Sequence, residues 1–296
     1  MVVFAGQGDG RRSMALLWRA VGAGAARAIP GPKPGLSVDA IVAAGVEIAD
    51  TEGMAMLSMR AVGSRLGCTA MALYTYVPGK SELVDLMHDR VLAELPTEYA
   101  VTVGWRPAIT AWADDTWAFY LRHPWVLRVS QARPILGPGE YAQLETVVRI
   151  LGTTGLASSV LLRVIGSLFQ FVRGTAGVAA EAREAAPVTG VSDEEWWITR
   201  SALLAEVAPD FARRFPGLAA LEAGAARESC AADVSARDGG PDGGPGGGPG
   251  PGEAATPYLA AEARETFVVG LSLILDGIDT AVRRAAEARV SEEIIH

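Results

Sequence analysis

One stretch, residues 57–87, restricts most narrowly what this chain can fold into; it reads LSMRAVGSRLGCTAMALYTYVPGKSELVDLM. Ser58 is a preferred type of residue for a helix N-cap, and the apolar residues after it recur at helical spacing. Gly67 tolerates the positive φ of a helix C-terminal turn because it has no Cβ. The residues expected on the buried side are Met59, Val62 and Leu66. The pattern predicts one short helix that begins at Ser58 and ends at Gly67.

A second helix is predicted directly after this turn, with Thr69 as its cap and Leu73 facing inward. Its outer face carries small or aromatic side chains, namely Ala70, Met71, Tyr74, Thr75 and Tyr76. Such a face can enter the major groove of DNA, where methyl groups contact thymine and hydroxyls contact phosphate. We therefore expect a helix–turn–helix whose second helix reads DNA.

A third helix is expected from Pro78 to about Leu95, because proline suits the first turn of a helix, where its missing N–H would be unpaired anyway. Lys80 lies in that turn, beside backbone N–H groups that also attract phosphate. The cations expected where DNA would be met are Arg60, Arg65 and Lys80. The full set of candidate DNA contacts is Ser58, Arg60, Thr69, Ala70, Met71, Tyr74, Tyr76 and Lys80. Arg60 is the candidate for a guanine contact, whereas Tyr74 and Lys80 are expected to hold phosphates.

Residues 36–95 resemble the DNA-binding domain of the tetracycline-repressor (TetR) family, especially the branch with ALY, V and K at the positions of Ala72–Tyr74, Val77 and Lys80. The resemblance implies an all-α fold. It implies an N-terminal three-helix DNA-binding domain with a helix–turn–helix, followed by a larger helical domain for ligand binding and dimerisation. It also implies that the helix after Pro78 joins the two domains, so that movement at its far end displaces the reading helix.

The predicted organisation has three parts. Residues 1–35 are rich in Gly and Ala and basic, and we expect a flexible arm that either follows phosphates or enters the minor groove, or that has no fixed role, with a short helix possible at 13–28. Residues 36–95 form the DNA-binding domain. Residues 96–290 form the helical ligand-binding and dimerisation domain, interrupted by a Gly/Pro-rich segment, 222–256, that is expected to be a disordered loop.

A ligand site for a mostly apolar molecule would be lined by aromatic residues with a few polar groups. The candidates are Trp112, Thr116, His123, Trp125, Phe169, Gln170 and Arg173, with Trp196 or Trp197 closing the site. The alternative is that these aromatic residues are ordinary core. His88, on the helix after Pro78, is interpreted as a surface or interdomain residue.

Two long helices, 156–183 and 258–289, are the predicted homodimer interface. The last helix carries more apolar surface than one neighbour covers, through Phe267, Leu271, Ile274, Leu275, Ile278 and Val282. Small residues on the earlier helix, Gly166, Gly174 and Gly177, allow a second helix to approach closely. The family resemblance implies the same four-helix interface, and a two-fold dimer would present two reading helices to a palindromic operator.

Composition limits the other classes of function. Two cysteines fit neither a disulfide framework nor a metal site, and the three histidines are widely separated, so neither an enzyme nor a cofactor or metal is expected. We expect no membrane span and a cytoplasmic protein. The expected function is a ligand-responsive repressor that binds double-stranded operator DNA and is released by a small, mostly apolar molecule. The net charge of −8 keeps an alternative open, a small-molecule binding or sequestering protein that no longer binds DNA.

Overall fold

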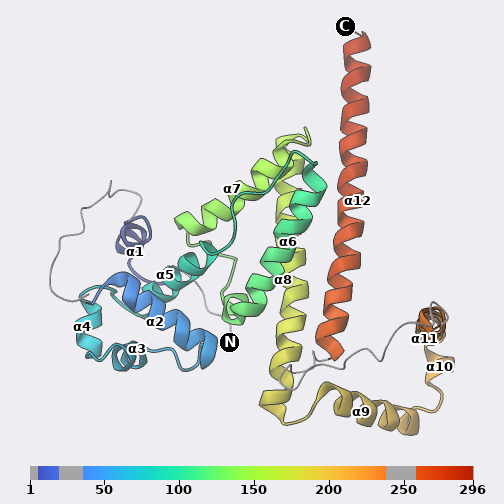
Figure 1. The fold of residues 1–296 in the computed structure, drawn as a ribbon, viewed down its shortest axis with the longest axis horizontal. Coiled ribbons are helices and arrows are strands. Elements are labelled where there is room, and N and C mark those ends of the chain that lie inside the picture. The colour runs from blue at the N-terminus through green and yellow to red at the C-terminus, as the bar shows by residue number, and fades with distance from the viewer. Residues whose placement is uncertain (1–5, 20–35, 238–257, 296) are drawn as a thin grey trace. The chain divides into compact units, whose positions relative to one another are not determined.

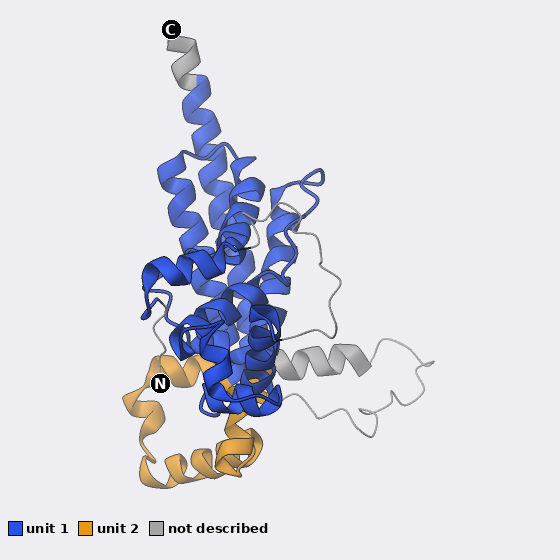
Figure 2. Ribbon diagram, turned by 90° about the vertical axis from the view of Figure 1, so that its left-hand side faces the viewer, with its two compact units in different colours: residues 1–180, 263–296 blue, residues 181–262 orange. Residues whose placement is uncertain are grey.

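The computed structural model describes residues 6–19, 36–237 and 258–295, and every regular element in those ranges is a helix (Figure 1). The predicted all-α fold class is confirmed. The chain divides into two compact units (Figure 2), the first made of Met1–Ala180 with Ala263–His296 and the second of Glu181–Glu262. The predicted division at residue 95 therefore lies inside the first unit, and it stays a prediction about function.

The N-terminal part of the first unit packs five helices around one apolar core. They are α1 (Gly10–Leu17), α2 (Val38–Thr51), α3 (Met59–Arg65), α4 (Ala70–Tyr74) and α5 (Lys80–Leu92). Helix α2 begins at Ser37, whose hydroxyl oxygen accepts the N–H of Ala40 at 3.1 Å. The core residues that are almost fully buried include Ile41, Ile48, Leu57, Leu73, Leu83 and Met87. Helix α5 contacts both α1 and α2, so it lies at the centre of this group.

The rest of the first unit is a bundle of longer helices. It contains α6 (Trp105–Arg122), the 3-10 helix η1 (Pro124–Arg128), α7 (Pro138–Gly152), most of α8 (Ser158–Thr189) and most of α12 (Tyr258–Ile295). Aromatic rings hold three of these helices together, because Phe267 of α12 lies 4.6 Å from Trp117 of α6 and 6.0 Å from Phe171 of α8, measured between ring centroids. Helices α6, α8 and α12 run side by side in Figure 1.

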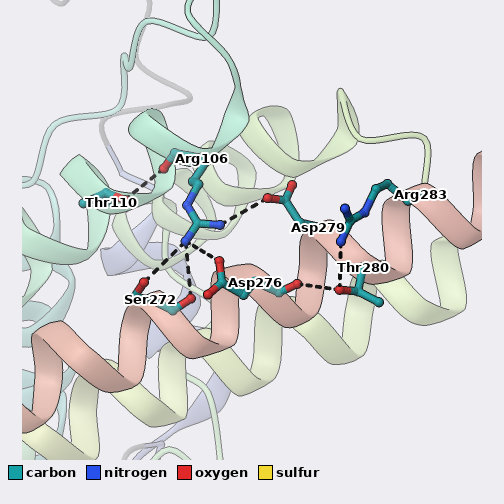
Figure 3. A network of polar contacts seen from close by, with 7 residues as sticks. All are labelled: Arg106, Thr110, Ser272, Asp276, Asp279, Thr280 and Arg283. Carbon is teal, nitrogen blue, oxygen red and sulfur yellow. Dashed lines mark hydrogen bonds and ion pairs between the residues drawn. The ribbon is translucent and has the colours of Figure 1, made fainter.

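Arg106 fastens the start of α6 to α12 (Figure 3). Its guanidinium forms ion pairs with Asp276 at 2.7 Å and Asp279 at 3.1 Å, and it donates to the carbonyl and hydroxyl oxygens of Ser272 at 3.4 Å. The three partners lie on successive turns of α12. One side chain therefore fixes the position of α6 along that helix.

The second unit contains α9 (Asp193–Val207), α10 (Phe211–Arg214) and α11 (Pro216–Arg237). Ser192 caps α9, since its hydroxyl oxygen accepts the N–H of Glu195 at 3.2 Å. Trp196 and Trp197 pack edge to face with centroids 5.3 Å apart, and each is more than two-fifths exposed.

The two segments predicted to lack structure need correction where the structure describes them. Within the predicted arm, Gly10–Leu17 form a helix that contacts α5, so this part does not extend freely; residues 1–5 and 20–35 lie outside the described residues. Within the predicted loop, residues 222–237 continue α11, because an Ala-rich sequence without proline is a good helix former. Residues 238–257 lie outside the described residues.

Candidate functional site

The predicted helix–turn–helix is present, and its turn is fixed by backbone geometry. The hydroxyl oxygen of Ser58 accepts the N–H of Ala61 at 3.1 Å, and that of Thr69 accepts the N–H of Ala72 at 3.3 Å, so both predicted caps are confirmed. Gly67 has the predicted positive φ of 67°. A second glycine, Gly63, allows the two helices to meet, because a Cβ there would lie 2.8 Å from the carbonyl oxygen of Cys68.

The reading helix α4 has the predicted inner and outer faces. Leu73 is fully buried, whereas Met71 is 75% exposed and Tyr74 is 41% exposed. Tyr76, just beyond the helix, is also exposed, and Ala70 is half-buried. The exposed side chains form a short apolar and aromatic surface that a DNA groove could accept. The individual DNA-contact roles of these residues stay predictions.

The cations near this surface are fewer than the sequence indicated. Arg60 is exposed on α3, and Lys80 is exposed in the first position of α5. Arg65, however, forms ion pairs with Glu47 at 2.7 Å and Glu52 at 2.5 Å, both on or beside α2. Arg65 therefore joins α3 to α2, and its charge is already balanced by acids of the same domain.

Helix α5 begins two residues later than predicted, at Lys80 and not at Pro78, with Gly79 as the N-cap. Beyond its first turn the helix is enclosed, and nearly every residue from Glu82 to Val91 is buried. The enclosed residues include three acids, Glu82, Asp85 and Asp89. A helix that connects a DNA-reading domain to a bundle would transmit movement through contacts such as these.

Asp89 joins α5 to α7. Its Oδ1 accepts the backbone N–H groups of Gly139 at 2.8 Å and Glu140 at 3.2 Å, which are unpaired donors at the start of α7. Burial raises the pKa of Asp89, while these two N–H groups and the charge of Arg19 act in the opposite direction. The approach is so close that a Cβ at Gly139 would lie 2.3 Å from the carbonyl oxygen of Asp89.

His88, one residue earlier, is buried, so the surface alternative of the sequence interpretation is wrong, and the interdomain alternative stays a prediction. Desolvation, with a smaller contribution from the charge of Arg173, lowers the pKa of His88 to about 4, so the ring is neutral near pH 7. Among the described residues, Nδ1 of His88 has no hydrogen-bond partner. A buried polar atom of this kind is costly unless a ligand or water satisfies it.

Trp112 has another unsatisfied buried group, since its Nε1–H finds no acceptor within the described ranges. The Trp112 ring is fully buried in α6 and meets Phe169 of α8 edge to face, with centroids 4.9 Å apart. Arg173, whose charge acts on His88, lies one helical turn after Phe169 on α8. Phe169 and Arg173 of α8 are thus related to the two unsatisfied groups in different ways: Phe169 contacts the Trp112 ring, and the charge of Arg173 acts on His88.

The other candidate ligand residues have different surroundings. Thr116 is buried, and its hydroxyl donates to the carbonyl oxygen of Trp112 at 2.7 Å within the same helix. Gln170 is exposed on the outer face of α8, whereas Phe169 lies inward. Trp196 and Trp197 belong to the second compact unit. The structure therefore brings Trp112 and Phe169 together and separates Gln170 from them.

His123 and Trp125 face the DNA-reading part of the unit. The ring nitrogens of His123 lie 2.8 Å from Oδ1 of Asp50 and 3.2 Å from Oε2 of Glu94, and the Nε1–H of Trp125 donates to Asp50 at 2.7 Å. Asp50 belongs to α2, and Glu94 follows α5. This buried histidine therefore joins α2 and the end of α5 to the end of α6.

Arg173 holds the segment around η1. Its guanidinium donates to the carbonyl oxygens of Val126 at 3.3 Å and Val129 at 2.8 Å, and also to that of Leu127. It also lies over the ring of Tyr120, 5.9 Å from the centroid. The guanidinium donors are thus largely used within the protein, which leaves less for a ligand than the sequence indicated.

Neither a metal site nor a membrane-spanning helix is found in the described part of the chain. No group of three His, Cys, Asp or Glu residues there could hold a metal ion. Of the helices in the same ranges, none is long and apolar enough to cross a membrane.

The described residues thus contain a capped helix–turn–helix with an exposed second helix, followed by an enclosed helix and a helical bundle. A family model described as "Tetracyclin repressor-like, C-terminal domain" matches residues 101–232. The chain is 42% identical over 219 residues to HTH-type transcriptional repressor DrrR1 of Streptomyces coeruleorubidus, covering 73% of this chain and 78% of that protein. The chain belongs to the TetR family of transcriptional regulators, and this family and DrrR1 are regulators, not enzymes.

Solved structures support the fold. Apo ActR from Streptomyces coelicolor superposes with a TM-score of 0.59 at 21% identity, covering 87% of this chain and all (100%) of ActR. ActR in complex with actinorhodin gives a TM-score of 0.59 at 22% identity, covering 84% of this chain and 99% of ActR. At this level of identity the likeness concerns the fold alone.

Proposed function

We propose that this protein is a homodimeric, ligand-responsive transcriptional repressor that binds a palindromic operator and is released when a small, mostly apolar molecule enters the bundle. The assignment as a repressor draws on the 42% identity with DrrR1, which is named as one. The observation that supports the ligand response is the placement of three residues along α5. This helix begins with Lys80 beside α3 and α4, which we call the reading pair. It bears the unsatisfied His88 in its middle and caps α7 through Asp89.

The proposed ligand contacts are His88 and Trp112, with Phe169 as an apolar wall. Neutral His88 can accept a hydrogen bond through Nδ1 if the other ring nitrogen carries the proton, and Trp112 can only donate. A fitting molecule would present a hydroxyl or N–H to the first and a carbonyl oxygen to the second, within a mainly apolar body. Because His88 lies on α5, occupancy would favour a different position of that helix and of the reading pair.

The proposed dimer contact is the outer face of α8 and α12. The residues expected from the sequence to seek a partner, such as Phe267 and Leu271, are buried within their own chain. Apolar residues that stay exposed on these two helices include Leu162, Val178, Val268, Val269 and Leu273. At Gly166, Gly174 and Gly277 a Cβ would meet no described atom within 4 Å, so a partner helix can approach closely.

The experiment that tests the function as a whole is a mobility-shift titration with the DNA that flanks the protein's own gene. A specific shift that competes poorly with random DNA is the expected result. If no DNA fragment is shifted while small apolar molecules still bind, the protein is a binding or sequestering protein. Arg65 favours that alternative, because its pairing with Glu47 and Glu52 removes one cation from the reading surface.

Two substitutions separate the proposed DNA roles. Arg60→Ala should relax sequence preference, because a lost guanine contact removes about 1–3 kcal/mol of discrimination. Lys80→Ala should weaken binding to DNA of every sequence by a similar factor. It should also lower the slope of log affinity against log salt by about one, because one phosphate contact is lost. Titrations on operator and random DNA at several salt concentrations measure both. If each variant lost the same affinity for operator as for random DNA, the proposed roles would be wrong. Arg213→Ala on α10 is the control.

A matched pair of valine substitutions tests the dimer. Val269→Asp places a charge in the proposed interface and should weaken dimerisation on the order of 100-fold, because an unpaired charge would be buried there. Val103→Asp is the control, since Val103 is 72% exposed and Val269 is 60% exposed. Sedimentation equilibrium measures the dimer dissociation constant. A dimer equally stable in both variants would place the interface elsewhere.

A further inference from the structure

The described N-terminal residues, 6–19, are fastened to α5 at their beginning, and we call this segment the N-terminal strap. The N–H of Gly6 donates to both carboxylate oxygens of Asp85 at 3.1 Å, and the hydroxyl of Ser13 donates to the same group at 3.3 Å. The N–H of Asp9 donates to Oε1 of Glu82 at 3.3 Å. Two buried acids of α5 therefore obtain hydrogen-bond donors from the strap.

The far end of the strap reaches two other elements. The Nε1–H of Trp18 donates to the carbonyl oxygen of Leu136, just before α7, at 2.9 Å, and its ring lies 6.2 Å from that of Tyr141 on α7. Arg19 forms an ion pair with Asp39 at the start of α2. Between these ends, Leu17 is 4% exposed and belongs to the core.

The strap therefore spans the joint that Asp89 makes between α5 and α7. On α5 the strap uses Glu82 and Asp85, which precede Asp89 along the helix, and on the other side it contacts the turn and first residues of α7. If α5 moved relative to α7, the Asp89 cap would have to break, and so would the strap contacts at one of its two ends. Each buried acid left without its donors would then cost free energy.

We propose that the N-terminal strap is an intramolecular brace that holds α5 against α7 and so fixes the orientation of the DNA-reading pair. The consequence for operator binding rests on the proposed function, whereas the brace itself does not. A braced reading pair is already oriented for DNA. Without the brace, each reading pair must be ordered on binding, which weakens affinity.

The test is hydrogen exchange of the Gly139 and Glu140 amides in the full chain, because these amides are protected by Asp89 at the joint. The variant combines Ser13→Ala with Trp18→Phe, which removes two hydrogen bonds of the strap and keeps its apolar packing. The matched control is Met14→Ala, since Met14 is exposed on the same helix. Exchange at the two amides should rise about tenfold or more in the double variant, corresponding to two lost bonds of ordinary strength, and stay unchanged in the control.

Two further readouts make the outcomes distinct. Amides in the buried parts of α8 and α12 should keep their protection, which shows that the bundle is folded in the variant. Affinity for the DNA that flanks the gene should fall about threefold to tenfold, because the reading pair must then be ordered. Unchanged exchange at Gly139 and Glu140 would overturn the brace, even if DNA binding is normal. If the unaltered protein fails to bind DNA, the proposed repressor function fails, and the exchange result still decides the brace.

Discussion

Replacing Gly139 with alanine should destabilise the protein by about 3 kcal/mol, because the new methyl group has no room at the joint between α5 and α7. Its Cβ would lie 2.3 Å from the carbonyl oxygen of Asp89 and 3.0 Å from its Oδ1. The carbonyl belongs to the backbone of an enclosed helix and cannot rotate away. The start of α7 must therefore move, and the bonds from the Gly139 and Glu140 N–H groups to Asp89 weaken.

Urea unfolding of Gly139→Ala and of Gly152→Ala measures this effect with an internal control. Gly152 ends the same helix, and a Cβ there would meet no described atom within 4 Å. Alanine at that position should be neutral or stabilise by at most about 1 kcal/mol, because alanine is the better helix former. Equal behaviour of the two variants would mean that the close contact with Asp89 does not hold α5 and α7 together.

Lowering the pH from 6.5 to 4 should cost about 3 kcal/mol of unfolding free energy through His88 alone. The pKa of this residue is about 4 in the folded protein, against an ordinary value of 6.5. In that window the unfolded chain binds a proton that the folded protein excludes, so stability is complete above about pH 6.5 and falls as the pH is lowered. The slope is at most about 1.4 kcal/mol per pH unit.

The measurement compares the pH dependence of urea unfolding in the unaltered protein and in His88→Leu. Leucine cannot be protonated and needs no hydrogen-bond partner, so the difference in stability between the two proteins should grow toward leucine as the pH falls. Burial raises the pKa values of Asp85, Asp89 and Glu140, which gives these acids a dependence of the opposite sign in both proteins. A difference that stays constant between pH 6.5 and 4 would show that His88 is solvated in the folded state.

The parts of the site that the sequence predicted correctly are those governed by neighbouring residues. The Ser58 and Thr69 caps, the positive φ of Gly67 and the exposure of Met71 all follow from interactions within a few positions. The all-α fold was implied by the family resemblance that this same stretch carries. The local rules identify a reading pair without any knowledge of what packs behind it.

The missed features depend on residues that are distant in the sequence. The sequence indicated that Arg65 would be free to contact DNA. In the structure it pairs with Glu47 and Glu52, on or beside another helix. His123 is held by Asp50, which is 73 positions away, and nothing in the local pattern indicates that pairing. Contacts of this kind are set by the tertiary arrangement of helices.

For a related reason, the burial of His88 was not predicted. Helical spacing assigns α5 one apolar face, through Leu83, Met87 and Val91, and leaves His88 outside it. That rule assumes a helix with one side in water. Helix α5 is packed by α1, α2 and α7, so polar residues that the pattern sends to the surface are buried. Glu82, Asp85 and Asp89 recur at helical spacing, which by itself indicates an exposed polar face, so the local pattern carried no signal of this burial.

The enclosure of α5 also limits how this helix can move. Rolling about its own axis would carry Asp85 and Asp89 away from the N–H groups that they accept and would bring apolar side chains to those donors. Sliding along its axis would break the same bonds, whereas a small tilt about the Asp89 joint changes these distances least. Of the rigid-body motions open to a rod, α5 therefore retains mainly tilt about Asp89, which would displace Lys80, at the far end of the helix, more than Asp85.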